Sequence, residues 1–304
     1  MVTSPRTLNR IHRLSIPPAY EEVWISPYEN GHLQATARDA LGRKQYFYHP
    51  EWIQIQTSNK FHRVYVFGKH LPLIRKKIRQ DLKRPGLHKE RVLAALVSIM
   101  DKTHVRIGND IYAKTHQTFG LTTLRKRHAS ISRKGVCLKF EGKNQTPWEI
   151  RLEDPKVVKV IKKCTDIPGY ELFKYIDEEG QKRVLCSEDF NAYLQTLSGQ
   201  DFTAKDFRTW AACKETFCSL ASRVKEADPQ NSPQLLKDAL KKVARLMGHT
   251  LAVCTQSYIH PALIQSWENG AFQRWIEIES VPPSEKLFLK WWKAHIKEAK
   301  VTSF

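Results

Sequence analysis

The chain has 304 residues, of which 50 are Lys or Arg and 31 are Asp or Glu, so its formal net charge is +19. This length predicts two domains with a real hydrophobic core, and the charge favours a polyanionic partner, nucleic acid before a membrane surface. No apolar stretch approaches the roughly 20 residues of a membrane-spanning helix, and the N-terminal segment lacks the apolar centre of a secretory signal, so we expect a cytoplasmic protein.

The cysteines show no pattern of a metal site. None forms a CxxC pair or has the Cys/His spacing of a zinc site, and structural disulfides are rare in a reducing cytoplasm, so we expect six buried, apolar thiols. No cluster of Asp, Glu and His has the spacing of a two-metal nuclease, and no glycine-rich phosphate loop is present. We therefore expect neither a metal nor a nucleotide cofactor. The cysteines are Cys137, Cys164, Cys186, Cys213, Cys218 and Cys254.

The N-terminal part has the character of a small β-rich domain. From about Ile16 to Phe67, short β-prone runs are separated by turn signals. In the run that ends at Tyr48, strand alternation places Tyr46 and Tyr48 on one face and Gln45 and Phe47 on the other. After Gly68 the periodicity becomes helical and the charge dense. We place the boundary near residues 68 to 76, with domains at 1–72 and 73–304.

Alternation returns between residues 135 and 152 and predicts a β-hairpin. Lys143 lies in the turn, on the tip of this hairpin, where most lysines serve only solubility. The apolar positions of the two strands are Val136, Leu138 and Phe140, then Trp148, Ile150 and Leu152.

The second half of the chain is predicted to be helical. Ser187 can cap a helix that ends before Gly199. Thr203 and Asp206 have the spacing of a capping box, so the next helix begins at about residue 204. Lys205 and Arg208 then share a face near the amino end of that helix, where the helix dipole disfavours cations. Such a placement is sensible if an anion such as phosphate docks there.

The following segment places a histidine and a tyrosine on adjoining elements. Ser232 and Pro233 open a helix that Gly248 stops, and His249 follows at the corner. Thr250 can cap a last short helix that carries Tyr258 and ends before Pro261. Together these patterns predict an α+β protein, in which a small β-rich N-terminal domain precedes a larger, mainly α-helical domain with a β-hairpin.

Several segments resemble, in order, those of type IB DNA topoisomerases. Their residues are Arg106-Ile-Gly-Asn-Asp-Ile-Tyr-Ala-Lys with Phe119-Gly-Leu-Thr-Thr-Leu, Phe140-Glu-Gly-Lys143, Lys205-Asp-Phe-Arg208-Thr-Trp, Gly248-His249-Thr250 and Ser257-Tyr258-Ile-His-Pro. Ile16-Pro-Pro-Ala-Tyr, Gly31-His-Leu-Gln-Ala-Thr and Gly42-Arg-Lys-Gln-Tyr resemble the DNA-gripping domain of the small bacterial and poxviral members. The resemblance covers nearly the whole chain and implies the fold shared by the catalytic domains of these enzymes and of tyrosine recombinases.

The resemblance implies a reaction and a set of catalytic residues. Tyr258 attacks a phosphodiester of duplex DNA and holds the 3′ end as a phosphotyrosine, which stores the bond energy and makes ATP unnecessary. Arg106, Arg208 and His249 suit the stabilisation of charge that develops on the phosphate oxygens. Lys143 suits the general acid for the 5′ oxygen, and the resemblance adds Lys205 as its helper.

The resemblance also identifies DNA contacts outside the chemistry, at Gln45, Tyr46, Tyr48 and Tyr112, and a monomer that clamps around the duplex. Three positions differ from several relatives, which have Pro where this chain has Leu251, a basic residue in place of Thr255 and a lysine in place of Asn109.

Two other functions agree with parts of the sequence. A tyrosine recombinase uses the same Arg, Lys, Arg, His and Tyr chemistry, but recombinases usually have His in place of Lys205 and a helical N-terminal domain. A basic DNA-binding protein without activity is allowed by composition alone, and it would bind DNA with a steep salt dependence and form no covalent adduct.

Overall fold

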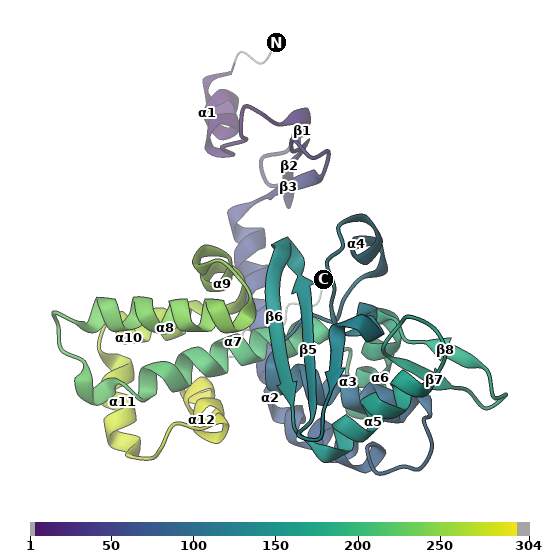
Figure 1. Ribbon diagram of the computed structural model, residues 1–304. Coiled ribbons are helices and arrows are strands. Elements are labelled where there is room, and N and C mark those ends of the chain that lie inside the picture. The colour runs from purple at the N-terminus through teal and green to yellow at the C-terminus, as the bar shows by residue number, and fades with distance from the viewer. Residues whose placement is uncertain (1–3, 297–304) are drawn as a thin grey trace. The chain divides into compact units, whose positions relative to one another are not determined.

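The structure, a computed structural model, describes residues 4–296, which divide into two compact units at residues 62 and 63 (Figure 1). Unit 1 contains α1 (Pro5–Arg13), β1 (Glu21–Ile25), β2 (Leu33–Arg38), β3 (Lys44–Tyr48) and the beginning of α2 (Pro50–Asp81). The first helices and strands of unit 2 are the rest of α2, α3 (Lys89–Thr103), α4 (Asp110–Thr115), β4 (Ala129–Ile131), β5 (Val136–Gly142), β6 (Thr146–Leu152) and α5 (Pro155–Asp166).

Unit 2 continues with β7 (Lys174–Ile176), β8 (Lys182–Val184), α6 (Ser187–Ser198), α7 (Ala204–Ala221), α8 (Ser232–Met247), α9 (Leu251–Tyr258), α10 (Pro261–Glu268), α11 (Ala271–Glu279) and α12 (Glu285–His295). Four short 3-10 helices lie between these elements: η1 (Leu121–Thr123), η2 (Lys126–His128), η3 (Lys143–Gln145) and η4 (Val224–Glu226). The predicted α+β class, with β structure first and a mainly helical part after it, is confirmed.

Unit 1 is built on a three-stranded antiparallel sheet in the order β1-β2-β3. Along β3 the exposure alternates as predicted: Tyr46 and Tyr48 are exposed, whereas Gln45 and Phe47 are half-buried. The two tyrosine rings stack with centroids 6.2 Å apart, so they form one exposed aromatic surface.

The prediction of β structure as far as Phe67 is wrong, because α2 begins at Pro50. Proline suits the first turn of a helix, where its missing N–H would have no partner. Beyond it, buried apolar residues recur every three or four positions, at Phe61, Val64, Phe67, Leu71 and Ile74, which is helical spacing. The predicted domain boundary at residues 72 and 73 falls inside this same helix, as does the division between the units.

Helix α7 forms the centre of unit 2. It packs against α3, α8, α9, α10 and α12, and most of its side chains are buried. Trp210 and Phe217 of α7 meet an aromatic layer from α12, in which Phe288 contacts both of them with centroids 4.9 and 5.3 Å away. A helix buried on nearly all sides is held in a defined position, so any side chain it carries is held there too.

The hairpin is found where the sequence predicts it. Strands β5 and β6 pair antiparallel, with Phe140 opposite Trp148, and β4 adds to the free edge of β5. Lys143 begins the turn that joins the two strands and is exposed. A second, two-stranded sheet of β7 and β8 completes the strands of this unit.

Three predicted details need correction. Ser187 is the first residue of α6, and Cys186 occupies the cap position, where its N–H donates to Asp189 Oδ2 at 3.0 Å. Helix α9 ends before Pro261 as predicted, but it is not the last helix, because Pro261 starts the first of three more within the described residues. All of the cysteines are free, but Cys137, Cys186 and Cys218 are only half-buried. Within residues 4–296, no helix is long and apolar enough to cross a membrane.

The contact between Gly68 of α2 and Trp210 generates a prediction. In an ordinary helix, replacing Gly by Ala stabilises by about 1 kcal/mol. A Cβ at Gly68, however, would lie 2.2 Å from the Trp210 ring. We expect Gly68→Ala to lower the free energy of unfolding by about 1 to 3 kcal/mol, as overpacking does. Urea unfolding measures the difference, with Gln80→Ala on an exposed position of the same helix as control. A stabilised Gly68→Ala would contradict the packing described here.

Candidate active site

The centre of the site is the buried side chain of Arg208, which is 4% exposed. Its guanidinium donates to the backbone carbonyls of His104 and of Met247, the latter at 2.7 Å. Both carbonyls belong to helix C-termini: His104 caps α3 in the left-handed conformation, and Met247 is the last residue of α8. Carbonyl groups at a helix end lack partners within the helix and carry partial negative charge. They therefore stabilise a cation that has been removed from water.

Burial still leaves Arg208 electrostatically costly. Loss of solvation and the nearby charge of Arg106 lower the pKa of Arg208 to about 10, while Tyr258 acts in the opposite direction. Arg208 therefore keeps its charge at neutral pH, in a place where an additional anion would stabilise it.

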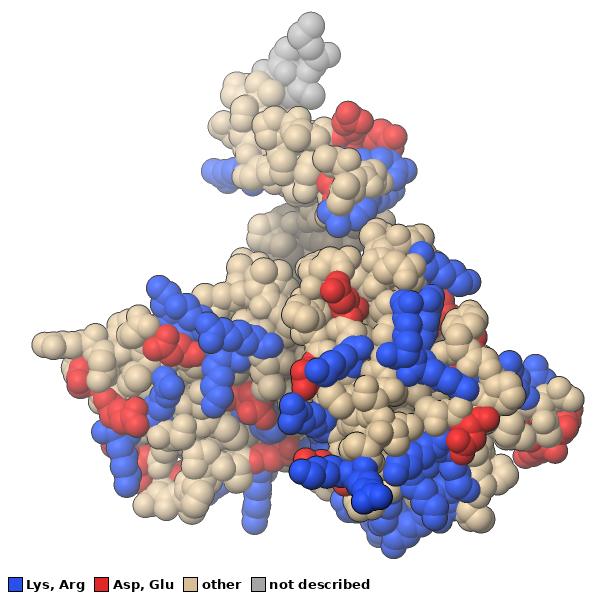
Figure 2. All heavy atoms as spheres, viewed as in Figure 1, with Lys and Arg blue, Asp and Glu red and all other residues tan. Residues whose placement is uncertain are grey.

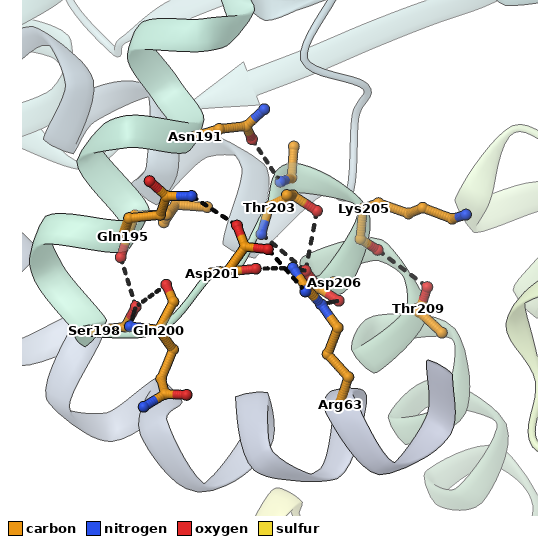
Figure 3. A network of polar contacts seen from close by, with 12 residues as sticks. Arg63, Asn191, Gln195, Ser198, Gln200, Asp201, Thr203, Lys205, Asp206 and Thr209 are labelled. Carbon is orange, nitrogen blue, oxygen red and sulfur yellow. Dashed lines mark hydrogen bonds and ion pairs between the residues drawn. The ribbon is translucent and has the colours of Figure 1, made fainter. Parts of the chain in front are cut away.

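The amino end of α7 is held by a network of ion pairs and hydrogen bonds (Figure 3). Asp206 accepts from the N–H and the hydroxyl of Thr203 at 2.8 and 3.0 Å, which confirms the predicted capping box. The same carboxylate pairs with Arg63 of α2 through two hydrogen bonds of 3.0 Å. Arg63 also donates to the backbone carbonyl of Asp201. Lys205 is exposed, and its side chain extends away from this network (Figure 3).

A close approach of two backbone segments positions Arg106. The carbonyl of Arg106 accepts from Leu121 N at 3.0 Å, and that of Ile107 accepts from Thr122 N at 2.7 Å. A Cβ at Gly120 would lie 2.4 Å from the backbone N of Gly108, and Gly108 itself has φ of +110°. Only glycines allow these two backbone segments to come so close together. This explains why each segment of the first motif contains a glycine.

His249 lies between the two arginines. Its Nε2 is 3.0 Å from a guanidinium nitrogen of Arg208 and 3.2 Å from one of Arg106. Guanidinium groups only donate, so a ring nitrogen that bonds to one of them has to accept, and this requires a neutral imidazole. Burial and then the charges of Arg106, Arg208 and Lys143 lower the pKa of His249 to about 4. Lys143 makes the smallest of these contributions.

Tyr258 completes the cluster from the end of α9. Thr250 caps that helix as predicted, because its hydroxyl accepts from Val253 N at 3.3 Å. The ring of Tyr258 is buried, and its centroid lies 4.5 Å from that of His249. The Arg208 guanidinium carbon is 5.9 Å from the same ring. The structure thus brings Arg106, Arg208, His249 and Tyr258 together from four separate segments.

The candidate DNA-contact residues lie outside this cluster. In unit 1, Tyr46 and Tyr48 are exposed, whereas the Gln45 amide donates to Asp39 Oδ2 at 2.9 Å on the opposite face. In unit 2, Tyr112 is 51% exposed on α4. Asn109, which differs from several relatives, caps α4 by accepting from the N–H groups of Ile111 and Tyr112.

The surface around the site is basic. Figure 2 shows Lys and Arg side chains over the face of unit 2 that carries β5, β6 and α8, with fewer Asp and Glu between them. Among residues 4–296, no group of three or more His, Cys, Asp and Glu side chains could hold a metal ion.

Sequence reasoning missed the groups that hold the catalytic candidates. The carbonyls of His104 and Met247 leave no sequence signal, because every residue has a carbonyl. Arg63 was also missed, although its partner Asp206 was found as a capping residue. One signal was available: Gly142 and Gly248 directly precede Lys143 and His249, and a glycine beside a functional residue often marks a close approach.

Two family models match the chain. One, described as the catalytic core of eukaryotic DNA topoisomerase I, matches residues 49–275. The other, described as the N-terminal domain of bacterial DNA topoisomerase IB, matches residues 1–39.

Viral proteins are among the relatives. The chain is 32% identical over 272 residues to DNA topoisomerase 1B of Acanthamoeba polyphaga mimivirus, covering 87% of this chain and 81% of the relative. It is 26% identical over 258 residues to DNA topoisomerase I of Monkeypox virus and 25% identical over 258 residues to DNA topoisomerase 1B of Vaccinia virus (strain Copenhagen). Each of these two matches covers 83% of this chain and 77% of the relative.

The low pKa of His249 predicts how stability depends on pH. In the unfolded chain a histidine takes up its proton near pH 6.5, whereas folded His249 resists protonation down to about pH 4. Its contribution to stability is therefore complete above pH 6.5 and is lost as the pH falls towards 4. We expect His249→Gln to reduce the loss of unfolding free energy between pH 7 and 5, as measured by urea unfolding. His128, whose pKa burial and two arginines also lower to about 4, offers a parallel variant, His128→Gln. An unchanged pH dependence in His249→Gln would mean that the pKa of His249 is not lowered in the folded protein.

Proposed function

Because the chain belongs to the type IB DNA topoisomerase family, we propose that it relaxes supercoiled duplex DNA with Tyr258 as its nucleophile. The enzyme cuts one strand, lets the duplex rotate and reseals the cut. The observation that carries this proposal is the convergence of two guanidinium groups and a neutral imidazole beside the Tyr258 ring.

The proposed cleavage is an in-line exchange of one phosphodiester for another. The Tyr258 oxygen forms a bond to phosphorus, the bond from phosphorus to the 5′ oxygen breaks, and the phenolic proton passes to solvent water as the oxygen attacks. The protein then holds the 3′ end as a phosphotyrosine, and the 5′ end is a free hydroxyl. Resealing reverses these steps and needs no ATP, since the phosphotyrosine retains the energy of the broken bond. No metal is required by this sequence of steps.

Arg106, Arg208 and His249 stabilise the charge that grows on the non-bridging oxygens. Two arginines supply donors that fit phosphate oxygens and remain charged. The neutral ring of His249 retains one N–H to donate, and the negative phosphate offsets the repulsion between the surrounding cations. Arg208 also lies beside the Tyr258 ring, where its charge favours the developing phenolate.

Lys143 acts as the general acid that protonates the departing 5′ oxygen, a role worth about 10² to 10⁴ in rate. Its influence on the pKa of His249 supports a position near the reacting phosphate. Lys205, which is exposed in the first turn of α7, assists proton transfer.

The duplex contacts both units in this proposal. Exposed tyrosines in unit 1, at positions 46 and 48, and Tyr112 in unit 2 suit contacts with bases or sugars, and Gln45 adds a hydrogen-bonding group. One copy of the chain closes around the DNA as a monomer in the cytoplasm.

The first test is relaxation of positively and negatively supercoiled plasmid in EDTA without ATP, with denaturation by SDS to trap protein-linked DNA. We expect both activities in the unmodified protein. Tyr258→Phe removes only the nucleophilic oxygen, so it should bind DNA normally and lose relaxation and adduct together.

Other outcomes identify the alternatives. An adduct that persists in Tyr258→Phe would exclude this tyrosine as the nucleophile. Binding with a steep salt dependence but no adduct in the unmodified protein would indicate a DNA-binding protein without activity. Adduct formation confined to one specific site, with strand exchange, would indicate a recombinase.

The role of Lys143 has its own test. We expect Lys143→Ala to cleave an ordinary strand about 10² to 10⁴ times more slowly and to recover on a strand whose 5′ leaving oxygen is replaced by sulfur. A thiolate leaves with little help from an acid. Single-turnover cleavage of the two substrates measures this, with Lys139→Ala, an exposed lysine on β5, as control. Equal slowing on both substrates would mean that Lys143 is not the acid.

A further inference from the structure

Trp148 lies against both of the glycines that precede candidate catalytic residues. A Cβ at Gly142 would lie 2.7 Å from its Nε1, and a Cβ at Gly248 would lie 2.9 Å from its Cζ2. Gly142 is followed by Lys143, and Gly248 by His249. One indole ring therefore touches the hairpin tip and the corner between α8 and α9.

The ring has little freedom to move. Trp148 lies opposite Phe140 in the β5–β6 ladder, and the two rings stack at 6.4 Å with planes only 7° apart. Phe140 is buried, so the indole packs against a ring that is itself held in the core. Thr146 adds a methyl group on the Gly248 side.

The hairpin tip itself is less well supported. Its three residues are exposed, and two of them, Asn144 and Gln145, have φ of +60° and +56°. Gln145 makes one long hydrogen bond, at 3.4 Å, to the carbonyl of His116. The Lys143 carbonyl also accepts from the Thr146 hydroxyl at 3.0 Å. This bond holds the backbone of the tip, so support for the position of the lysine as a whole has to come from elsewhere.

We propose that Trp148 is a positioning residue for Lys143, and that it sets the spacing between the lysine tip and the His249 corner. This inference rests on the proposed function of Lys143 as general acid. Gly142 and Gly248 belong to the same arrangement, because any side chain at either position would push the indole away. A displacement of about 1 Å at a reacting group can cost on the order of 10²-fold in rate, so a support of this kind has a measurable effect.

The test compares leaving groups. We expect Trp148→Ala to slow single-turnover cleavage about 10- to 100-fold on an ordinary strand and to recover most of that loss on a strand with a 5′ sulfur. Trp148→Phe keeps a flat ring and should lose much less. Glu149→Ala, which removes an exposed partner of Lys139 and Arg151 on the other face of β6, is the matched control and should cleave normally.

A double variant separates action through Lys143 from a general loss of packing. If Trp148 acts through the lysine, Lys143→Ala with Trp148→Ala should cleave no more slowly than Lys143→Ala alone. Multiplied effects would overturn the inference. So would a Trp148→Ala defect that sulfur does not relieve while Lys143→Ala is relieved, or the absence of any defect.

Failure of Lys143 as the acid and failure of Trp148 as its support give different results. If Lys143→Ala is not relieved by sulfur, the assignment of the acid is wrong, and with it the basis of the inference. Circular dichroism and DNA binding check that each variant is folded. Where Trp148→Ala is not folded, Trp148→Leu, which keeps apolar volume without the flat ring, replaces it in the same comparison.

Discussion

The burial of one positive charge, that of Arg208, organises the whole site. A guanidinium removed from water needs strong acceptors, and here it finds them in the last carbonyls of two helices, at His104 and Met247. Each carbonyl lies two residues before another functional candidate, Arg106 in one case and His249 in the other. The interactions that stabilise the buried arginine therefore also align its neighbours. Helix α7 holds Arg208 in place, because aromatic packing and the Asp206–Arg63 pair fix the helix on several sides.

The site holds several positive charges close together, so it is more stable with a bound anion than without one. The charges that lower the pKa of His249 are all positive, from Arg106, Arg208 and Lys143. Like charges at short range destabilise the folded chain, and a phosphate diester placed among them would relieve the repulsion. Such an arrangement is characteristic of sites that bind a charged transition state, since donors that are already in place need not reorganise during the reaction. The family assignment and the local physics thus point to the same substrate.

The hairpin carries Lys143, the proposed general acid, which is not part of the buried cluster. Its strands are well paired, but its tip is exposed. Lys143 lies in this tip, and its amino group is at the end of a long side chain. Trp148 connects this tip to the His249 corner through two positions that have no side chain. Arg208 and Tyr258 are thus held by burial, whereas Lys143 is exposed and depends on the support of its hairpin.

Local patterns in the sequence by themselves determined much of this protein. Caps, glycine stops and apolar spacing located the hairpin and the helices that carry Arg208 and Tyr258, because these signals act within a few residues. The same local reasoning failed between residues 50 and 67, where β-prone side chains belong to a helix begun by Pro50. Only the tertiary structure decided that Arg208 is buried, that Lys205 three residues earlier is exposed, and that Trp148 touches two distant glycines. Those facts depend on contacts between segments far apart in the chain. The backbone carbonyls that hold Arg208 occur in every residue, and a glycine does not indicate which distant ring will lie against it.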